Sequence, residues 1–407
     1  MYHDPTQMEP LFPGGAEHLR DLAVDIVRRS AALGGQLHPI TRTTISRHLR
    51  IINSYYSNLI EGHSTHPADI ERAMRKEYAK DPAKRALQRE SLAHIKVQQE
   101  VEERSKAEPE LNIAEADFLQ WVHRRFYEGL PDEFRKVTDP QTREEFEVIP
   151  GELRRREVEV GRHIAPRHDT LGVFLNRFAS FYHRSRFHGA DPVIAAAAAH
   201  HRLMWIHPFL DGNGRVARLF TDAYLTRVPV DGHGLWTVSR GLARRRDDYM
   251  AALTWGDARR ENDYDGRGNL SNKGLIHFCE FFLEICLDQI HFMNELLQLD
   301  SLLDRIRGYV ELRKSKVIAA PTPDYESMKL EMMYLLQEVM LRGEMTRGEA
   351  ARATGLPERT ARIYLKQLLD EGLLMSESAK GRVHLGLPTH VSGYWFPNLY
   401  PEQLVST

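Results

Sequence analysis

Apolar residues recur every three or four positions between Thr43 and Glu61, the spacing that places them on one face of an α-helix. Gly62 follows directly, and glycine readily adopts the left-handed conformation that ends helices. The segment is therefore predicted to be an amphipathic helix that ends near Glu61. Its apolar face would consist of Ile45, Leu49, Ile52, Tyr56 and Leu59.

Two further helices are predicted on either side of a glycine-containing turn. The alanine-rich segment Pro192–Trp205 has a helical pattern with Asp191 as its N-cap, and a second pattern runs from about Arg215 to Leu225. The turn Gly212-Asn213-Gly214 would open the second helix. Unpaired N–H groups and the positive dipole end of a helix bind phosphate, and glycine lets the backbone approach closely. The turn therefore predicts a polyphosphate site.

Four parts are predicted along the chain, and the predicted fold class is mainly α. Residues 1–105 form a charge-rich helical region, in which a helical stretch from about Asp69 to Glu103 is interrupted at Pro82. Residues 106–300 form a core that closes with the Ser271–Gln298 helix. Residues 301–324 are a helical extension and a linker, because Ala319-Ala-Pro-Thr-Pro323 breaks the helical pattern. Residues 325–407 form the last domain.

This last domain has the pattern of a winged helix-turn-helix. Helices are predicted over Thr346–Ala353 and Glu358–Glu371, with a turn at Gly355-Leu-Pro between them and a wing hairpin around Lys380–Leu387. The predicted core consists of Ala350, Ala353, Ile363, Leu365, Leu368 and Leu369.

The second of these helices carries three basic residues, Arg359, Arg362 and Lys366, that are candidates for DNA contacts. Acidic residues flank the same helix, so a regulatory or dimerising protein-contact module is the alternative.

Composition is that of a soluble protein of two or three domains, with 407 residues of which 42% are hydrophobic. A net charge of −2 disfavours a strongly basic nucleic-acid-binding chain and a membrane-surface protein. The sequence has neither a secretory signal nor a membrane-length apolar run, so no membrane partner is expected. Cys279 and Cys286 are expected to be buried free thiols of a cytoplasmic protein. The 20 histidines lack the spacing of a zinc site.

The segment His207–Arg218 reads His-Pro-Phe-Leu-Asp-Gly-Asn-Gly-Arg-Val-Ala-Arg and is the part of the chain richest in reactive groups. It matches the signature of the Fic family, His-x-Phe-x-Asp/Glu-Gly-Asn-Gly-Arg-x-x-Arg, at every defined position. The resemblance implies a Fic-type helical core with a β-hairpin flap. It also implies transfer of AMP from ATP to a protein hydroxyl, with release of pyrophosphate. A polar interhelical loop is the alternative, since Asp, Asn and Gly are common turn residues.

The resemblance also implies a role for each residue. His207 would accept the proton of the attacking hydroxyl, which suits an imidazole at neutral pH. Asp211 would hold Mg²⁺ between the α- and β-phosphates, because one carboxylate with phosphate oxygens and waters makes a normal magnesium shell. The amides of Gly212, Asn213 and Gly214 would form an anion hole. Arg215 and Arg218 would neutralise the triphosphate.

Ser57 and Glu61 resemble the inhibitory motif of many Fic proteins, Ser/Thr-x-x-x-Glu-Gly/Asn, here N-terminal to the core as in class II. Four residues apart, they share one face of the predicted helix. The resemblance implies that Glu61 pairs with Arg218 and denies that arginine to the γ-phosphate. A solvated glutamate at a helix end is the alternative.

Two more segments resemble parts of Fic proteins. The stretch from Val158 to Pro166 is similar to the flap hairpin, with Val158 and Val160 alternating as in a strand and Gly161 as the bend. A flap would bind the target by adding it as a strand, and a plain surface hairpin is the alternative. Tyr249 is a candidate for lining the adenine pocket, with a position in the core as its alternative.

Two functions therefore stay open. One is an autoinhibited AMP-transferase that uses ATP and Mg²⁺ and modifies a Ser, Thr or Tyr hydroxyl of a target protein or of itself. The other is a DNA-binding or interaction regulator with the Fic core as a nucleotide sensor. The intact His207 favours the first, since a sensor needs no base. Removal of AMP, with Glu61 positioning a water, is a variant of the first. A homodimer is expected.

Overall fold

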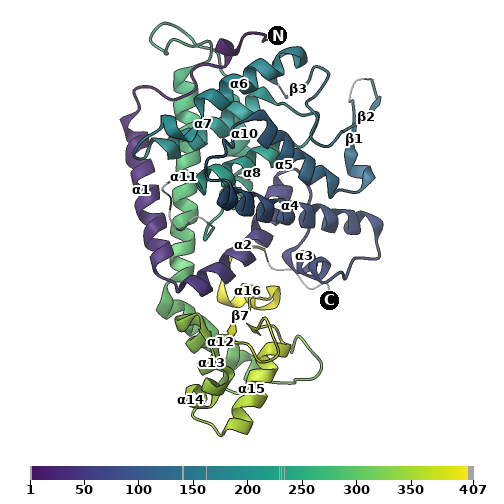
Figure 1. The fold of residues 1–407 in the computed structure, drawn as a ribbon, viewed down its shortest axis with the longest axis vertical. Helices are drawn as coiled ribbons and strands as arrows, with labels where there is room; N and C mark the ends of the chain where they lie inside the picture. The colour runs from purple at the N-terminus through teal and green to yellow at the C-terminus, as the bar shows by residue number, and fades with distance from the viewer. Residues whose placement is uncertain are drawn as a thin grey trace.

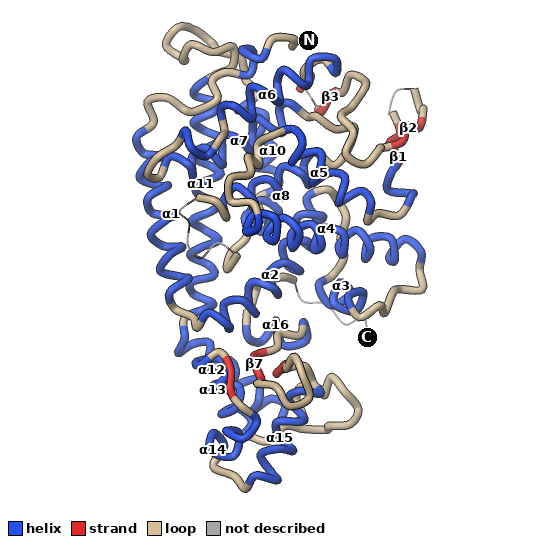
Figure 2. Tube along the Cα trace, in the orientation of Figure 1, coloured by secondary structure: helices blue, strands red, loops and turns tan. Residues whose placement is uncertain are grey.

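The computed structural model describes residues 2–139, 142–161, 163–228, 230, 232 and 234–401. Within these residues the chain forms sixteen α-helices and seven short strands, which confirms the mainly α fold class (Figures 1 and 2). A large upper lobe holds the N-terminal two thirds of the chain, and a smaller lower lobe holds the C-terminal part (Figure 1). None of the helices described is at once long enough and apolar enough to cross a membrane.

The N-terminal region begins with a 3-10 turn, η1, and continues with four helices. The bounds are η1 Pro5–Met8, α1 Glu17–Gly35, α2 Pro39–Ile60, α3 Pro67–Met74 and α4 Pro82–Ala107. The predicted helix at Thr43–Glu61 is α2, which begins four residues earlier because Pro39 suits the first turn of a helix. The predicted helical stretch from Asp69 to Glu103 is interrupted over residues 75–81, and Pro82 begins its second part, α4, whose N-cap Asp81 accepts a bond from Lys84 N at 2.8 Å.

The core contains seven helices and two small hairpins. The helices are α5 Ala116–Glu128, α6 Leu171–Phe181, α7 Asp191–Ile206, α8 Asn213–Leu225, α9 Val238–Arg244, α10 Arg246–Gly256 and α11 Asn272–Leu297. The antiparallel hairpins pair β1 Lys136–Thr138 with β2 Glu145–Glu147, and β3 Glu159–Val160 with β4 His163–Ile164. Short 3-10 turns are η2 Asp132–Arg135, η3 His168–Thr170 and η4 Arg184–Arg186.

Helix α7 is the centre of this core, since it packs against α1, α6, α8 and α11. A mostly apolar helix is suited to such a position, and Ala195 to Ala199 are all fully buried, as are His200, His201 and Arg202. Asp191 is the first residue of α7 and not its N-cap, which is Ala190, and the Asp191 carboxylate instead binds Arg20 of α1 at 3.0 Å. Helices α1 and α11 lie side by side although far apart in sequence (Figure 1). Cys279 and Cys286, both in α11, are free and buried as expected.

The C-terminal part contains five helices and a three-stranded antiparallel sheet in the order β5-β7-β6. The bounds are α12 Leu299–Lys314, α13 Met332–Arg342, β5 Glu344–Met345, η5 Arg347–Glu349, α14 Ala350–Thr354, α15 Glu358–Asp370, β6 Leu374–Met375, β7 Val383–Leu385 and α16 Thr389–Trp395. These elements follow the predicted helix, turn, helix and hairpin in order. The winged-helix identification and the boundaries of the four predicted parts remain predictions.

The predicted core of this domain needs one correction. Ile363 is 56% exposed, because it lies on the outer face of α15 beside Arg359, Arg362 and Lys366. Ala350, Leu365 and Leu368 are buried as expected. Ala353 and Leu369 are only partly buried.

The C-terminal segment packs along α2. Thr41 Oγ1 donates to the carbonyl of Met340 at 3.0 Å, and Tyr56 Oη donates to the carbonyl of Leu399 at 3.1 Å. Between them, His48 Nε2 lies 2.5 Å from Ser392 Oγ. Because positions 41, 48 and 56 are about two turns apart, they form one face of α2. That face is covered by the C-terminal part, while α4 and α9 pack against α2 from the upper lobe.

Candidate functional site

The loop His207–Gly212 connects α7 to α8 and is held by side chains of the loop and of the first residue of α8. Asn213 bridges the loop, since its Oδ1 accepts from Phe209 N and its Nδ2 donates to Phe209 O, both at 2.9 Å. Phe209 is fully buried and stacks on His123 with ring centroids 4.1 Å apart. Gly212 has φ +78°, and a Cβ there would come within 2.7 Å of the Tyr127 ring. Only glycine therefore fits at the start of α8.

His207 is the partly exposed residue at the entrance of this loop. It has the left-handed conformation, with φ 49° and ψ 61°, and its carbonyl accepts a bond from Arg154 Nε at 2.8 Å. Burial lowers the pKa of His207 to about 4, so the imidazole is neutral at physiological pH and free to accept a proton. The side chain lines a cavity of about 960 Å³.

The walls of that cavity come from the β3–β4 hairpin and from α10, and include Val160, Gly161, Ile164, Met250 and Leu253. Val158 lies just before β3, where its carbonyl accepts a bond from Ala165 N at 3.4 Å. Val160 and Ile164 are each 44% exposed, and Gly161 has φ +63° at the bend. The hairpin thus presents apolar side chains and a strand edge above the cavity that His207 lines.

Asp211 lies between a tyrosine and an arginine. Tyr127 Oη donates to its Oδ2 at 2.5 Å, and Arg215 Nη2 donates to the same oxygen at 3.0 Å. Burial acts to raise the pKa of Asp211, but the Arg215 charge and the Tyr127 bond outweigh it, so the pKa is lowered and the group is a carboxylate. Its side chain is still 43% exposed. An exposed carboxylate edge suits Mg²⁺, which is bound through one or two carboxylates plus phosphates and waters. The described residues contain no cluster of three or more potential metal ligands.

Arg215 is held between two carboxylates. Nη1 donates to Glu90 of α4, a residue with no exposed surface, and Nη2 donates to Asp211. The two Glu90 oxygens also lie 2.9 and 2.8 Å from His63 Nδ1. This bond to Glu90 raises the pKa of His63. The Arg215 side chain is only 5% exposed, so its contacts here are with protein carboxylates.

Arg218 lies one turn further along α8 and contacts the end of α2. Its Nε donates to Ser57 Oγ at 2.9 Å, and its Nη2 donates to Ser57 O at 3.0 Å and to Glu61 Oε1 at 2.5 Å. Burial acts to raise the pKa of Glu61, but Arg218 and Arg215 outweigh it and the pKa is lowered. The ion pair that the resemblance implies is thus present.

Glu61 also lies over the first turn of α8. A Cβ on Gly214 would overlap Glu61 Oε1 and would be 3.0 Å from Arg218 Nη1. The N-cap of this helix is Gly212, which has no side chain to cap the helix end. The Glu61 carboxylate therefore sits beside the N-terminal N–H groups where an anion would bind.

Two predicted sets of site residues need separate mention. Tyr249 is fully buried, with its hydroxyl 2.8 Å from His200 Nε2, and it lies close enough to interact with Arg218 and Glu61. That it lines the adenine pocket remains a prediction. The basic residues of α15 are exposed in the lower lobe, where Lys366 binds Asp370 at 2.5 Å and Arg362 binds Glu358 at 3.3 Å. That this face contacts DNA remains a prediction.

Three site residues were missed by sequence reasoning: Glu90, His63 and Tyr127. Glu90 is one acidic residue in the highly charged helix α4, and the other two have no motif around them. Glu90 differs from the other acidic residues of α4 by its complete burial, and this burial cannot be predicted from the sequence.

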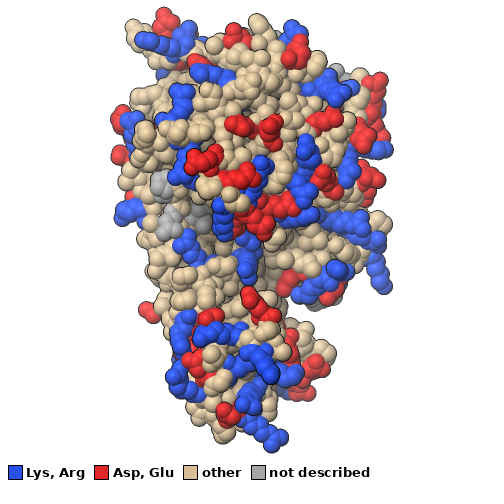
Figure 3. Space-filling view, viewed as in Figure 1, with Lys and Arg blue, Asp and Glu red and all other residues tan. Residues whose placement is uncertain are grey.

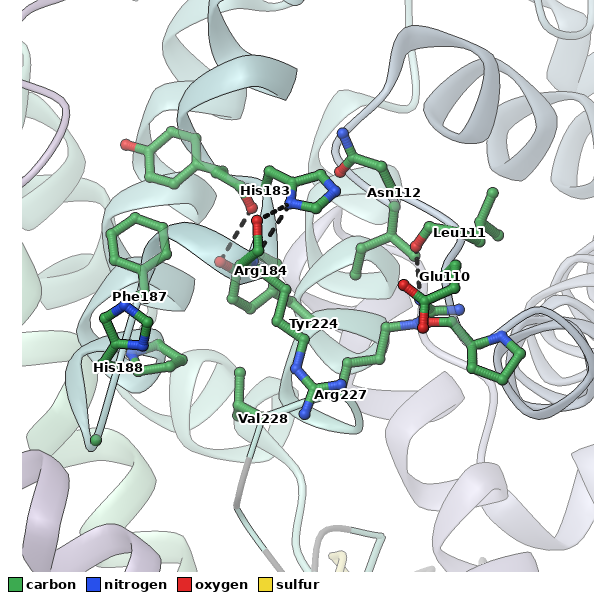
Figure 4. Close-up of a pocket in the computed structure, with 16 residues that line it drawn as sticks. Glu110, Leu111, Asn112, His183, Arg184, Phe187, His188, Tyr224, Arg227 and Val228 are labelled. Carbon is green, nitrogen blue, oxygen red and sulfur yellow. Dashed lines mark hydrogen bonds between the residues drawn. The ribbon is translucent and has the colours of Figure 1, made fainter.

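A separate cavity of about 550 Å³ lies at the far end of α8 (Figure 4). His183, Arg184, Tyr224 and Arg227 contribute to its wall. Arg227 donates to the carbonyls of Leu111 at 2.6 Å and Glu108 at 2.9 Å. The cavity lies away from the His207 loop, because α8 separates the two.

Comparison with known proteins agrees with this description. The Fic/DOC family model matches residues 114–225. A protein adenylyltransferase Fic from Aedes aegypti is 36% identical over 109 residues, which are 27% of this chain and 21% of that protein. One from Drosophila mojavensis is 43% identical over 78 residues, 19% of this chain and 16% of that protein. The chain thus spans about a fifth of the length of these curated relatives.

Solved structures extend the likeness in fold. A Fic family protein from Desulfovibrio desulfuricans has a TM-score of 0.50 at 17% identity, covering 89% of this chain and 95% of that one. A Fic domain containing signaling protein from Bacteroides thetaiotaomicron also has a TM-score of 0.50, at 18% identity, covering 68% of this chain and 97% of that one. The match of residues 114–225 covers α5 to α8 and includes the complete His207–Arg218 motif. Residues 114–225 of this chain are a Fic domain.

Proposed function

We propose that this chain transfers AMP from ATP to a hydroxyl group of a protein. The observation that carries the proposal is the placement of His207. Its neutral imidazole lines the cavity beneath the β3–β4 hairpin, in the same loop that opens α8 as an anion site. The curated relatives that match this region are called protein adenylyltransferases, which supports the same reaction here.

The proposed reaction consists of one proton transfer, one bond formed and one bond broken. His207 accepts the proton of the target hydroxyl, and the hydroxyl oxygen forms a bond to the α-phosphorus of ATP. The bond from that phosphorus to the bridging oxygen breaks, and pyrophosphate leaves with the bonding electrons. The helix N-terminus at Gly212–Gly214 stabilises the phosphates, as catalysis of this kind depends mainly on positioning and charge.

Mg²⁺ fits the donor set at Asp211 and, when bound, would neutralise charge on the phosphates. Asp211 is the residue that would hold it, with Tyr127 and Arg215 fixing the carboxylate from the other side.

The target protein would bind along the hairpin. An extended segment can pair with the free edge of a short strand, and such pairing uses backbone groups and accepts many sequences. The exposed Val160 and Ile164 would contact its side chains. A segment of a second copy of this chain satisfies the same requirement, which makes self-modification part of the proposal.

Autoinhibition is the second part of the proposal. The Glu61 carboxylate occupies the space beside Gly214 and binds Arg218, so a γ-phosphate would meet a negative charge in place of a free guanidinium. Two like charges brought together repel, which places ATP unproductively.

The test is transfer of label from ATP labelled in its α-phosphate, in the presence of Mg²⁺, by the wild type and by His207→Ala. Loss of a general base costs roughly 10²- to 10⁴-fold in rate. ATP binding, measured by calorimetry, should change little because other groups hold the phosphates. Label transfer by His207→Ala at the wild-type rate would exclude His207 as the base.

A further inference from the structure

Glu90 is a buried carboxylate outside the Fic domain. It is linked to Asp211, the proposed metal ligand, through hydrogen bonds that both carboxylates accept from Arg215. It belongs to α4, has no exposed surface, and accepts hydrogen bonds from Arg215 and His63. Burying a carboxylate is unfavourable unless its charge is paired and its hydrogen bonds are made. Its burial therefore calls for an explanation at the site that it contacts.

The explanation lies in the charge of Arg215. This guanidinium is almost completely buried and touches Asp211 with one nitrogen and Glu90 with the other. Without Glu90, Asp211 alone would offset the arginine. A divalent cation would then have to compete with a buried positive charge for the same carboxylate.

We infer that Glu90 is a positioning residue for magnesium: by pairing with Arg215 it leaves the Asp211 charge available to the metal. Asp211 and Glu90 carry two negative charges against one positive charge on Arg215, so the three groups have a net charge of −1. The same bond holds Arg215 in place, and Arg215 with Tyr127 orients Asp211 through Oδ2. The inference rests on the proposed function, in which Asp211 holds Mg²⁺.

Binding of ATP with and without Mg²⁺ separates this role from a merely structural one. We would measure the Kd of ATP by calorimetry, in EDTA and in Mg²⁺. The background is Glu61→Gly/His207→Ala, which removes the inhibitory carboxylate and prevents turnover of ATP. Glu90→Gln exposes the Arg215 charge, so ATP should bind more tightly in EDTA. The factor by which Mg²⁺ tightens ATP binding should fall. Substitution of residues that support metal ligands typically lowers metal affinity on the order of 10-fold or more. A loss of packing would weaken binding in both conditions.

Two variants complete the comparison. Glu100→Gln is the matched control, because Glu100 also lies on α4 and pairs with an arginine, Arg125, at 2.7 Å, but does not contact the site. Its ratio of Kd in EDTA to Kd in Mg²⁺ should equal that of the background. In Glu90→Gln/Arg215→Gln both charges are removed and the net charge is again −1, while Tyr127 still donates to Asp211 Oδ2, so the ratio should return toward the background value. This double variant also tests the inference if Glu90→Gln does not fold.

An unchanged ratio in Glu90→Gln, or a double variant as impaired as the single one, would overturn the inference. Failure of the proposed function gives a different result. If Asp211→Asn keeps the full effect of Mg²⁺ on ATP binding, Asp211 is not the metal ligand. If the wild type and Glu61→Gly proteins transfer no label, the proposed reaction is wrong whatever the Glu90 ratio shows.

Discussion

Arg215 and Arg218 are three residues apart on α8, yet their side chains meet different carboxylates. Arg215 binds Asp211 and Glu90, while Arg218 binds Glu61 and Ser57. Their positions in the motif assign both to the triphosphate, but the structure buries Arg215 among protein groups. At the scale of single residues, the motif predicts which side chains can bind phosphate. The neighbouring residues in the fold determine which group each of these side chains contacts.

Buried histidines make a prediction at the same scale. Burial lowers the pKa of His94, His123 and His200 to about 3, from a usual value of 6.5. Between these values the unfolded chain binds more protons than the folded one, so stability should fall as the pH drops from about 6.5 toward 3. Each such histidine contributes a slope of up to about 1.4 kcal/mol per pH unit.

The measurement is the free energy of unfolding by urea between pH 7 and 4. His200→Gln removes one of these groups and should make the pH dependence shallower, whatever its effect on stability at pH 7. An unfolding free energy that is constant over this range would contradict the burial of neutral histidines.

At the scale of elements, the end of α2 meets the start of α8. Each element has its own local cause, an apolar repeat for α2 and a glycine turn for α8. Their contact brings the acidic end of one helix to the positive end of the other, which is a favourable arrangement. An anionic substrate would have to displace this contact.

Glu61→Gly removes the carboxylate from this contact and should raise AMP transfer. Hydrogen bonds to charged groups contribute roughly 1.5–3 kcal/mol, and each 1.36 kcal/mol is tenfold in rate, so the expected rise is on the order of 10- to 100-fold. Self-modification should rise in parallel. The measurement is label from α-labelled ATP in Glu61→Gly, with Glu61→Gly/His207→Ala as the inactive control. Equal or lower transfer would refute autoinhibition and favour a glutamate that helps to remove AMP.

At the scale of the whole molecule, the lower lobe contacts α2, the helix that ends at the proposed inhibitory residue Glu61. The C-terminal segment bonds to α2 at three points, the last at Tyr56, one residue before Ser57. It also holds the segment after α2, because Thr389 N donates to Glu71 Oε2 of α3 at 2.8 Å. Charged side chains of both signs are interspersed over the face of both lobes seen in Figure 3, in keeping with a net charge of −2.

Removal of residues 319–407 should therefore remove the hydrogen bonds that fix α2 and make the Glu61–Arg218 contact at its end less stable. Each lost hydrogen bond is worth about 1 kcal/mol, so AMP transfer should rise on the order of 2- to 10-fold and hydrogen exchange of the α2 amides should accelerate. Tyr56→Phe deletes a single bond and should give a smaller change of the same sign. Unchanged transfer together with unchanged α2 protection would show that the lower lobe does not support the restraint.

The local sequence determined the helices and the reactive loop of this protein. Periodic apolar residues predicted α2, α7 and α8 to within a few residues, because helix formation and hydrophobic spacing are local properties. The motif from His207 to Arg218 identified the Fic domain, because its chemistry lies within twelve consecutive residues.

Tertiary structure decided what lies around that loop. Glu90 reaches Arg215 across 125 residues, Tyr127 reaches Asp211 across 84, and the C-terminal segment reaches α2 across more than 300. Packing also buried Tyr249 completely and placed Ile363 on the surface. Such contacts depend on how whole helices pack, and the identity of a charged or aromatic residue does not reveal which distant partner will neutralise or cover it.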